Sequence, residues 1–329
     1  MFLREIIGHT GPVQVLKNAL LKDRVAHAYL FSGPRGIGKT TTARAFAQAF
    51  LCEQGSESGD SCGECPSCRK FMRENHPDLK IIEPLGASLK IDQIRELVQK
   101  VYYKAYGGQG RVYILHDVDT MTTEAANSFL KILEEPPEGV LFLLISSQPY
   151  NLLTTIVSRC QVMQFFPLSN GDLENILVER FSVSRERAVF VASMARGLVA
   201  KALEYVQSED LDQQRQKLVD IAQRLLKGEI LLAFQIAEEL EKKKDELVDM
   251  LDLLAAWYRD LLVWKTTGES GLLINADMVE DVQEASQRLA RGRLLNNLEA
   301  IERTKGYLHS NVNNRLALEN MFLDLLGGN

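Results

Sequence analysis

The sequence predicts an α/β domain with a mostly parallel sheet, followed by a small helical domain and a larger all-α domain. Two observations predict this arrangement. Over residues 1–165, short apolar runs alternate with segments of helical periodicity, and from about residue 166 only helical spacing remains. We therefore expect three domains, at residues 1–165, 166–208 and 209–329.

Four apolar runs mark the expected strands, at residues 28–31, 79–82, 112–115 and 140–145. A well-bounded helix lies between the last two. It is expected to begin at Thr122–Glu124 and to end before Pro136–Pro137, because proline disfavours helical geometry at the residue before it. Such alternation is typical of a sheet whose strands are connected through helices on its faces.

A glycine-rich loop follows the first strand and matches the pattern G-x-x-x-x-G-K-[ST]. Glycines let a backbone approach a phosphate, and the loop amides and the next helix N-terminus direct positive partial charge at the anion. Lys39 would contact the outer phosphates and the Thr40 hydroxyl would bind Mg²⁺. The alternative is an ordinary glycine-rich turn, which the flanking strand and helix make the weaker interpretation. The residues expected to bind ATP or ADP are Gly33, Pro34, Arg35, Gly36, Ile37, Gly38, Lys39 and Thr40.

Four of the five cysteines fall in one short insert, at residues 52–68. Cys52, Cys62, Cys65 and Cys68 follow the spacing C-x9-C-x2-C-x2-C. Four thiolates in a loop with little apolar content suit a tetrahedral structural Zn²⁺ site that leaves no coordination position for catalysis. An iron–sulfur cluster and metal-free thiols are the alternatives. Cys160 is distant in sequence and is expected to be a small buried residue.

The third apolar run ends at His116 and Asp117, where magnesium-dependent ATPases carry Asp and Glu. Neutral imidazole is a poor ligand for Mg²⁺, which prefers oxygen, and Asp has a shorter reach than Glu. Asp117 is expected to belong to the nucleotide site; the alternative is a surface strand end with acidic residues. At the end of the fourth run, Ser146–Gln148 either contact the outer phosphate or simply end the strand. The sequence therefore predicts a pocket that binds nucleotide better than it hydrolyses it.

The bulk composition is that of a soluble globular protein, with 46% hydrophobic and 25% charged residues. A net charge of −6 and a pI near 5.6 argue against autonomous, tight, non-specific DNA binding, which needs a basic face. Met1–Glu5 is charged rather than apolar, and no apolar run is long enough to span a bilayer. We therefore expect a cytoplasmic protein with no membrane partner, whose cysteines are reduced or bind metal.

Several motifs occur together in an order that resembles a known family. His27–Phe31, the four-cysteine insert, His76–Leu79, Leu130–Pro137 and Ser158–Cys160 follow one another as in bacterial DNA polymerase III clamp-loader subunits, which are AAA+ proteins. The chain resembles the delta-prime subunits most, with the gamma/tau subunits as near relatives. These motifs cover roughly residues 8–205.

The resemblance implies an AAA+ P-loop domain with a zinc insert, then a helical lid and a collar domain that packs against other subunits. It extends the expected ATP- or ADP-binding set to Thr41, and it makes Arg159 an arginine finger that completes the ATP site of a neighbouring subunit. The implied partners are gamma/tau and delta subunits and, indirectly, the sliding clamp and primer-template DNA. The implied role is a stator of the clamp loader in DNA replication, with weak or absent ATPase activity of its own.

Two departures favour delta-prime over the alternative, a gamma/tau-like ATPase motor. The motor ends its third strand in Asp-Glu, where this chain has His116 and Asp117. The motor also carries a sensor Arg in a Gly-Ser-Leu-Arg-Asp-Ala-Leu segment, and the matching run 197–203 places Ala200 at that position. The complete glycine-rich loop is the feature that favours the motor, since some delta-prime proteins have lost it.

A stand-alone zinc-module nucleic-acid binder is a third hypothesis. The acidic net charge counts against it, and so does the lack of basic–aromatic interleaving around Cys62–Cys68.

Overall fold

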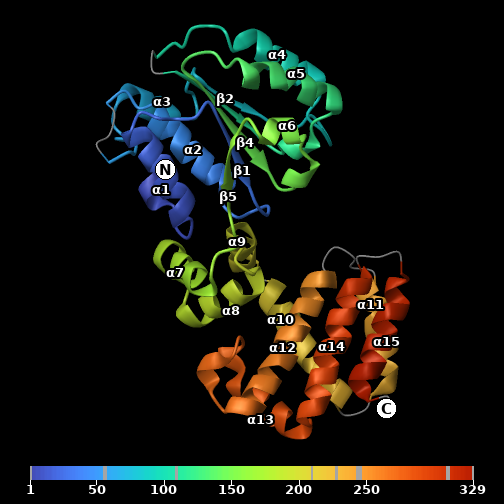
Figure 1. The fold of residues 1–329 in the computed structure, drawn as a ribbon. Helices are drawn as coiled ribbons and strands as arrows, with labels where there is room; N and C mark the ends of the chain where they lie inside the picture. Colours follow the sequence, from blue (N-terminus) through green and yellow to red (C-terminus); the bar gives the residue numbers. More distant parts are fainter. Residues whose placement is uncertain are drawn as a thin grey trace. The chain divides into compact units, whose positions relative to one another are not determined.

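The computed structural model describes residues 2–54, 58–107, 110–208, 210–226, 229–241, 247–308 and 312–327. The chain divides into two compact units (Figure 1). The first unit contains Met1–Leu173 and Gly197–Lys201, and the second contains Glu174–Arg196 and Ala202–Asn329. The finer boundaries at residues 165 and 208 stay predictions, and residue 209 lies outside the described residues.

A five-stranded parallel sheet forms the centre of the first unit, in the order β2-β3-β4-β1-β5. The strands are β1 (Ala28–Ser32), β2 (Leu79–Ile82), β3 (Arg111–Leu115), β4 (Val140–Ser146) and β5 (Gln161–Gln164). The first four confirm the expected strands. Strand β5 was not expected from the sequence, because only Met163 is buried in it and its flanking glutamines hide the apolar pattern.

Helices cover both faces of this sheet (Figure 1). On one face, Leu16 and Phe46 pack against Phe31 and other strand residues. On the opposite face, Leu97 and Phe129 pack against strand residues. The helices of the first unit are α1 (Thr10–Leu21), α2 (Lys39–Phe50), α3 (Pro66–Met72), α4 (Ile91–Lys100), α5 (Thr123–Glu134) and α6 (Thr154–Val157), with 3₁₀ turns at Leu3–Glu5, Val118–Thr120 and Pro149–Asn151.

Helix α5 confirms the predicted helix and its limits. The Thr122 side chain accepts a hydrogen bond from the Ala125 amide at 3.3 Å, as an N-terminal cap does. The helix ends at Glu134, just before the two prolines.

The second unit is helical throughout its described residues, as the sequence predicted. Its helices are α8 (Arg185–Ala195), α10 (Asp210–Leu226), α11 (Ile230–Glu241), α12 (Leu247–Thr267), α13 (Val279–Arg288), α14 (Arg291–Leu308) and α15 (Asn314–Leu326), with 3₁₀ turns at Ser270–Leu272 and Ala276–Met278. Helices α7 (Asn170–Phe181) and α9 (Val199–Gln207) each include residues of both units. Helix α12 packs against α13 and α14, with Trp257 and Tyr258 buried. Among the described residues, no helix combines the length and the apolar character that a bilayer crossing requires.

The core of the first unit provides a stability prediction. Phe142 is fully buried in β4, with its ring centroid 5.4 Å from that of Phe129 and 5.6 Å from that of Tyr113. Phe142→Ala is expected to lower the free energy of unfolding by about 3–5 kcal/mol, because it removes buried contacts and leaves a cavity. Urea denaturation followed by far-UV circular dichroism measures the loss.

The matched control is Phe166→Ala, since Phe166 is 67% exposed. It is expected to change the free energy of unfolding by less than about 0.5 kcal/mol. Equal losses for the two variants would contradict the assignment of Phe142 to the core.

Candidate nucleotide site and thiol cluster

The loop between β1 and α2 needs glycine for two reasons. Gly33, Gly36 and Gly38 have φ angles of +151°, +75° and +107°, which disfavour side chains. A Cβ atom at Gly33 would also lie 2.3 Å from the Phe165 carbonyl oxygen, and one at Gly36 would lie 2.8 Å from the Ala200 Cβ. The predicted motif therefore forms a tight loop at the carboxyl end of β1, with Lys39 as the first residue of α2.

Lys39 lies inside this loop rather than in solvent. The residue is 5% exposed, and its Nζ donates hydrogen bonds to the carbonyl oxygens of Gly33 at 2.5 Å and Pro34 at 2.7 Å. Burial lowers its pKa to about 8, although the carboxylates of Asp117 and Asp119 act in the opposite direction. The ammonium group is thus held at the centre of the loop, where the motif places an anion.

The end of β3 contributes a neutral imidazole and two carboxylates. The His116 amide bonds to the Ile82 carbonyl, and burial lowers the pKa of the imidazole. Asp117 adopts a left-handed backbone conformation and its carboxylate lies 3.1 Å from the Arg35 guanidinium. Asp119 accepts a hydrogen bond from the Ser147 amide at 3.1 Å. The position that would orient Mg²⁺ therefore carries a neutral nitrogen ligand, and the next carboxylate is paired with the loop.

A cavity of about 470 Å³ opens between the loop and the ends of the strands. The residues that line it are Pro34, Arg35, Asp119, Thr120, Ser147, Gln148 and Asn151. The structure thus brings the loop and the polar groups after β4 to the same cavity. A contact of Ser146–Gln148 with an outer phosphate stays a prediction. The sequence analysis did not select Asp119; the signal was the second carboxylate in His116–Asp119.

Two residues outside the motif support the loop from behind. His9 makes a 2.8 Å hydrogen bond from Nε2 to the Ile37 carbonyl, and its ring packs edge-on against Phe165. Burial lowers the pKa of His9, so the neutral ring donates this bond. The Ala200 amide donates to the Gly36 carbonyl at 3.0 Å. Position 200, where a motor subunit would carry its sensor Arg, thus lies against the loop. In this chain Ala200 presents only a methyl group there. No sequence signal marked His9.

The four predicted cysteine ligands come together. Their Sγ atoms all lie within 4.8 Å of one another, with separations of 3.6 Å for Cys52–Cys62, 4.0 Å for Cys52–Cys65 and 3.9 Å for Cys62–Cys68. A tetrahedral ion with bonds of about 2.3 Å requires sulfurs about 3.8 Å apart. A cubane iron–sulfur cluster requires wider spacing, because each thiolate then binds a different iron. The geometry therefore suits a single metal ion.

Backbone amides prepare one of these thiols for ionisation. Burial raises the pKa of Cys62, but amide hydrogen bonds from Glu64 and Cys65, each at 3.4 Å, together with neighbouring thiols bring it down to about 7. Burial raises the pKa values of Cys52 and Cys68. Because metal binding requires thiolates, occupation of the cluster must release protons. Cys160 lies outside the cluster, half-buried against the α5 and α6 side of the core, where burial raises its pKa to about 12.

Hydrogen bonds connect the cysteine insert to the rest of the first unit. The Asp60 carboxylate accepts from the amides of Leu3 at 3.0 Å and Arg4 at 2.9 Å. His76 accepts from the Asp78 amide through Nδ1, so its Nε2 carries the proton and donates to Ser67 of α3 at 2.9 Å. The cysteine insert is therefore anchored by buried polar groups on both sides.

Arg159 lies at the end of α6 and does not line the cavity beside the chain's own phosphate loop. Its guanidinium donates to the Glu134 carboxylate at 2.7 Å and to the Thr155 carbonyl at 3.0 Å. The side chain is 35% exposed. Exposed apolar side chains occur nearby in sequence, at Val162 and Phe166. The Arg159 guanidinium is therefore partly exposed and held in an ion pair with Glu134.

Comparison with known proteins places this geometry in context. Residues 8–169 match the family model described as DNA polymerase III, delta subunit, and residues 196–326 match DNA polymerase III, delta subunit, C terminal. DNA polymerase III subunit delta' of Bacillus subtilis is 34% identical over 319 residues, covering 96% of this chain and 95% of the relative. Subunit delta' of Pseudomonas aeruginosa is 33% identical over 303 residues, covering 89% and 90%. Subunit tau of Bacillus subtilis is 29% identical over 323 residues, but only 57% of its length is covered.

The thiol cluster predicts one bound metal ion per chain. Cys65→Ser is expected to reduce metal content from about one ion per chain to well below one, because a structural site needs all four thiolates. Elemental analysis of protein purified without chelators measures this. Cys160→Ser is the matched control and should retain the ion. Unmodified protein without metal, or loss of metal from the control, would contradict the assignment.

Proposed function

Since this chain belongs to the DNA polymerase III delta' family, we propose that it acts as a stator of a clamp loader. In this role it assembles with gamma/tau and delta subunits to load a sliding clamp onto primer-template DNA during replication. The helical second unit would form the collar that joins the subunits. Leu231 and Leu316, on α11 and α15, are large apolar side chains that this unit leaves exposed.

The observation that carries the proposal is the combination of a complete phosphate loop with His116 at the end of β3. Lys39 and the loop amides supply what ATP or ADP binding requires. Thr40 and Thr41, in the first turn of α2, and Asp117 belong to the same proposed site. Hydrolysis also needs a well-placed Mg²⁺ and an oriented water, and neutral His116 is unsuited to the first task. We infer a site that retains nucleotide with little turnover.

Arg159 supplies the second part of the proposed role. Its hydrogen-bond partners are Glu134 and Thr155 rather than groups of its own phosphate loop. An exposed guanidinium can reach the nucleotide of a neighbouring subunit and stabilise charge on the transferring phosphoryl group. The exposed pair with Glu134 stabilises the fold by at most about 1 kcal/mol, so little energy opposes release of the side chain.

Zn²⁺ is the proposed occupant of the cysteine cluster. Four thiolates with tetrahedral spacing and no water position suit a structural zinc ion, which would hold the insert in shape. Iron in gently purified protein would contradict this assignment.

A gamma/tau-like motor is the second candidate. The complete loop and the 29% identity to a tau subunit favour it. Turnover by the chain in the absence of other subunits separates the two candidates, because a motor retains its own catalytic carboxylates.

The nucleotide proposal makes a direct prediction. The unmodified chain is expected to bind ATP or ADP, and Lys39→Ala is expected to abolish binding, because it removes the ammonium group held at the centre of the loop by the Gly33 and Pro34 carbonyls. Isothermal titration calorimetry measures the affinity. Steady-state turnover without partner subunits should stay below about 1 s⁻¹. A faster rate in a preparation free of other ATPases would favour the motor.

The arginine-finger proposal is tested in the reconstituted loader. Arg159→Ala should leave nucleotide affinity, metal content and assembly unchanged, but slow hydrolysis at the affected interface by up to about 10³-fold. Arg159→Lys should restore little, because an ammonium group cannot make the planar two-point contact. Stopped-flow phosphate release reports the rate.

Arg95→Ala serves as the control for loss of an exposed arginine, since Arg95 lies on α4 with its side chain 63% exposed. Hydrolysis and clamp loading at the unmodified rate by the Arg159→Ala loader would show that Ser158–Cys160 is only a structural corner.

A further inference from the structure

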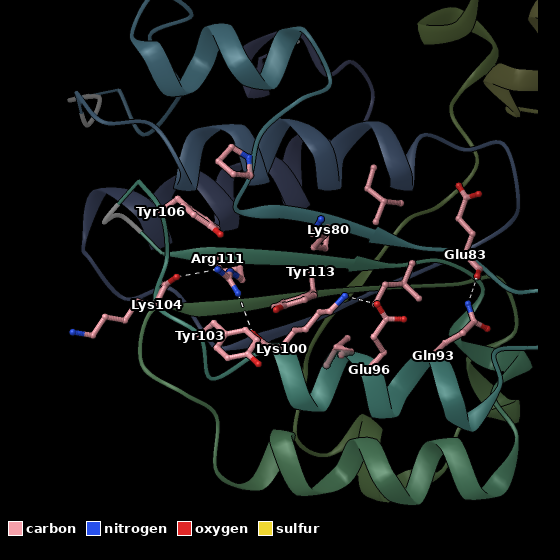
Figure 2. Close-up of a pocket in the computed structure, with 14 residues that line it drawn as sticks. Lys80, Glu83, Gln93, Glu96, Lys100, Tyr103, Lys104, Tyr106, Arg111 and Tyr113 are labelled. Atoms are coloured by element: carbon pink, nitrogen blue, oxygen red, sulfur yellow. Dashed lines mark hydrogen bonds and ion pairs between the residues drawn. The ribbon is translucent and has the colours of Figure 1, made fainter.

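A groove of about 700 Å³ lies along the free edge of the sheet in the first unit. Side chains of the edge strand β2, of β3, of α4 and of the segment after α4 line it (Figure 2). Its volume is within the range of ligand-binding sites. Arg111, one of its lining residues, begins β3, whereas His116 follows the end of that strand. The groove therefore reaches the amino-terminal ends of the strands, whereas the phosphate loop lies at their carboxyl ends.

Basic and aromatic side chains gather at one end of this groove. Residues 100–106 read Lys-Val-Tyr-Tyr-Lys-Ala-Tyr. Figure 2 shows Tyr103, Tyr106 and Arg111 at this end, with the Lys104 side chain directed outward from them and Glu83 at the far end. Tyr103 is 67% and Tyr106 is 83% exposed. Exposed aromatic rings interleaved with lysines along the chain are typical of surfaces that bind single-stranded nucleic acid, and the segment around Cys62–Cys68 lacks this pattern.

The floor of the groove carries polar atoms without partners. Tyr113 is 2% exposed and Arg111 is 7% exposed. Neither Tyr113 Oη nor Arg111 Nε has a hydrogen-bond partner among the residues that the structure describes. Buried polar atoms are normally paired, so these two atoms give the groove a polar floor whose hydrogen-bonding capacity is not fully used.

Buried polar contacts hold the aromatic wall in place. The fully buried Asp78 accepts hydrogen bonds from the amides of Tyr106 and Gly107, both at 2.8 Å. Arg111 donates to the carbonyl oxygens of Lys100 and Lys104, both at 3.0 Å, and its guanidinium lies 3.5 Å from the Asp78 carboxylate. The segment that carries the tyrosines is thus fixed before any ligand binds, which reduces the ordering cost of binding.

We propose that this tyrosine–lysine groove, formed by Lys100, Tyr103, Lys104, Tyr106, Arg111 and Tyr113, binds single-stranded DNA. Bases stack on Tyr103 and Tyr106, and the phosphates lie beside Lys104 and Lys100. Stacking on aromatic faces accepts any base and lysines contact the backbone, so binding needs no particular sequence.

Charge and ring exposure favour this ligand over an acidic peptide. Glu96 forms an ion pair with Lys100, and Glu83 lies at the other end of the groove, so the strand enters from the tyrosine end. An acidic peptide would satisfy the lysines but would offer the two exposed rings nothing flat to stack against. Because the protein is acidic overall, binding is expected to be weak and strongly salt-dependent.

Fluorescence anisotropy of the full chain with a labelled oligothymidylate of about 12 nucleotides tests the proposal. Tyr103→Ala and Tyr106→Ala should each weaken binding by about tenfold, whereas Tyr106→Phe should bind like the unmodified chain. Lys104→Ala should weaken binding and reduce the slope of log affinity against log salt by about 0.7. The matched controls are Tyr150→Ala, at a tyrosine that is 97% exposed outside the groove, and Lys131→Ala on α5; both should bind normally.

Four outcomes would overturn the proposal: no binding by the unmodified chain, equal affinity of Tyr106→Ala, equally tight binding of thymidine monophosphate, or tyrosine-dependent binding of polyglutamate instead. The last two would assign the groove to a free nucleotide or to an acidic peptide. Tyr106 is so exposed that its replacement leaves the core intact, which a thermal melt verifies. Lys39→Ala should bind the oligonucleotide normally, so this proposal and the nucleotide proposal fail separately.

Discussion

The burial of three central strands on both faces is the constraint on which the first unit depends. Strands β1, β3 and β4 are buried at every position, and their only charged side chain, Arg111, stands at the first residue of β3. The middle of the sheet therefore carries no charged side chain that could bind a ligand. The register pairs Ser32 with Ser146 and Leu115 with Leu144, so the strands end near one another. The segments that follow them meet at one edge, where parallel sheets generally bind ligands.

Outside the sheet, where strand-to-strand hydrogen bonds are absent, buried carboxylates hold segments of the chain in place. Asp60 and Asp78 each accept two backbone amides from segments distant in sequence. An ionised carboxylate is a strong acceptor with several lone pairs, so one side chain can satisfy two otherwise unpaired donors. The cysteine insert and the tyrosine-bearing segment both depend on this arrangement, and neither has an apolar core large enough to hold it alone.

Much of the fold and of the candidate site could be predicted from local sequence patterns. Apolar runs identified β1 to β4, and spacing identified the thiol cluster, because in both cases the decisive residues are close in sequence. The pattern failed at β5, whose single buried residue produces no period. It also failed for His9, which supports the phosphate loop at Ile37, 28 positions further along the chain. Such contacts arise only when the chain folds, so no local pattern records them. The groove at Tyr103 and Tyr106 has a sequence signature, but it becomes a site only because β3 places Tyr113 and Arg111 beneath it.

The contact between Gly36 and Ala200 determines which of these two positions tolerates a change of side chain. The Gly36 carbonyl accepts a hydrogen bond from the Ala200 backbone amide, a group that every residue except proline possesses. Ala200 itself is exposed. Replacing the side chain at position 200 leaves this hydrogen bond intact, so a cation can be lost or gained there at little cost to the fold. Gly36 has no such freedom, since its positive φ and the neighbouring methyl group exclude a side chain. Position 200 can therefore change its side chain, and with it the charge beside the loop, while Gly36 and the loop conformation stay fixed.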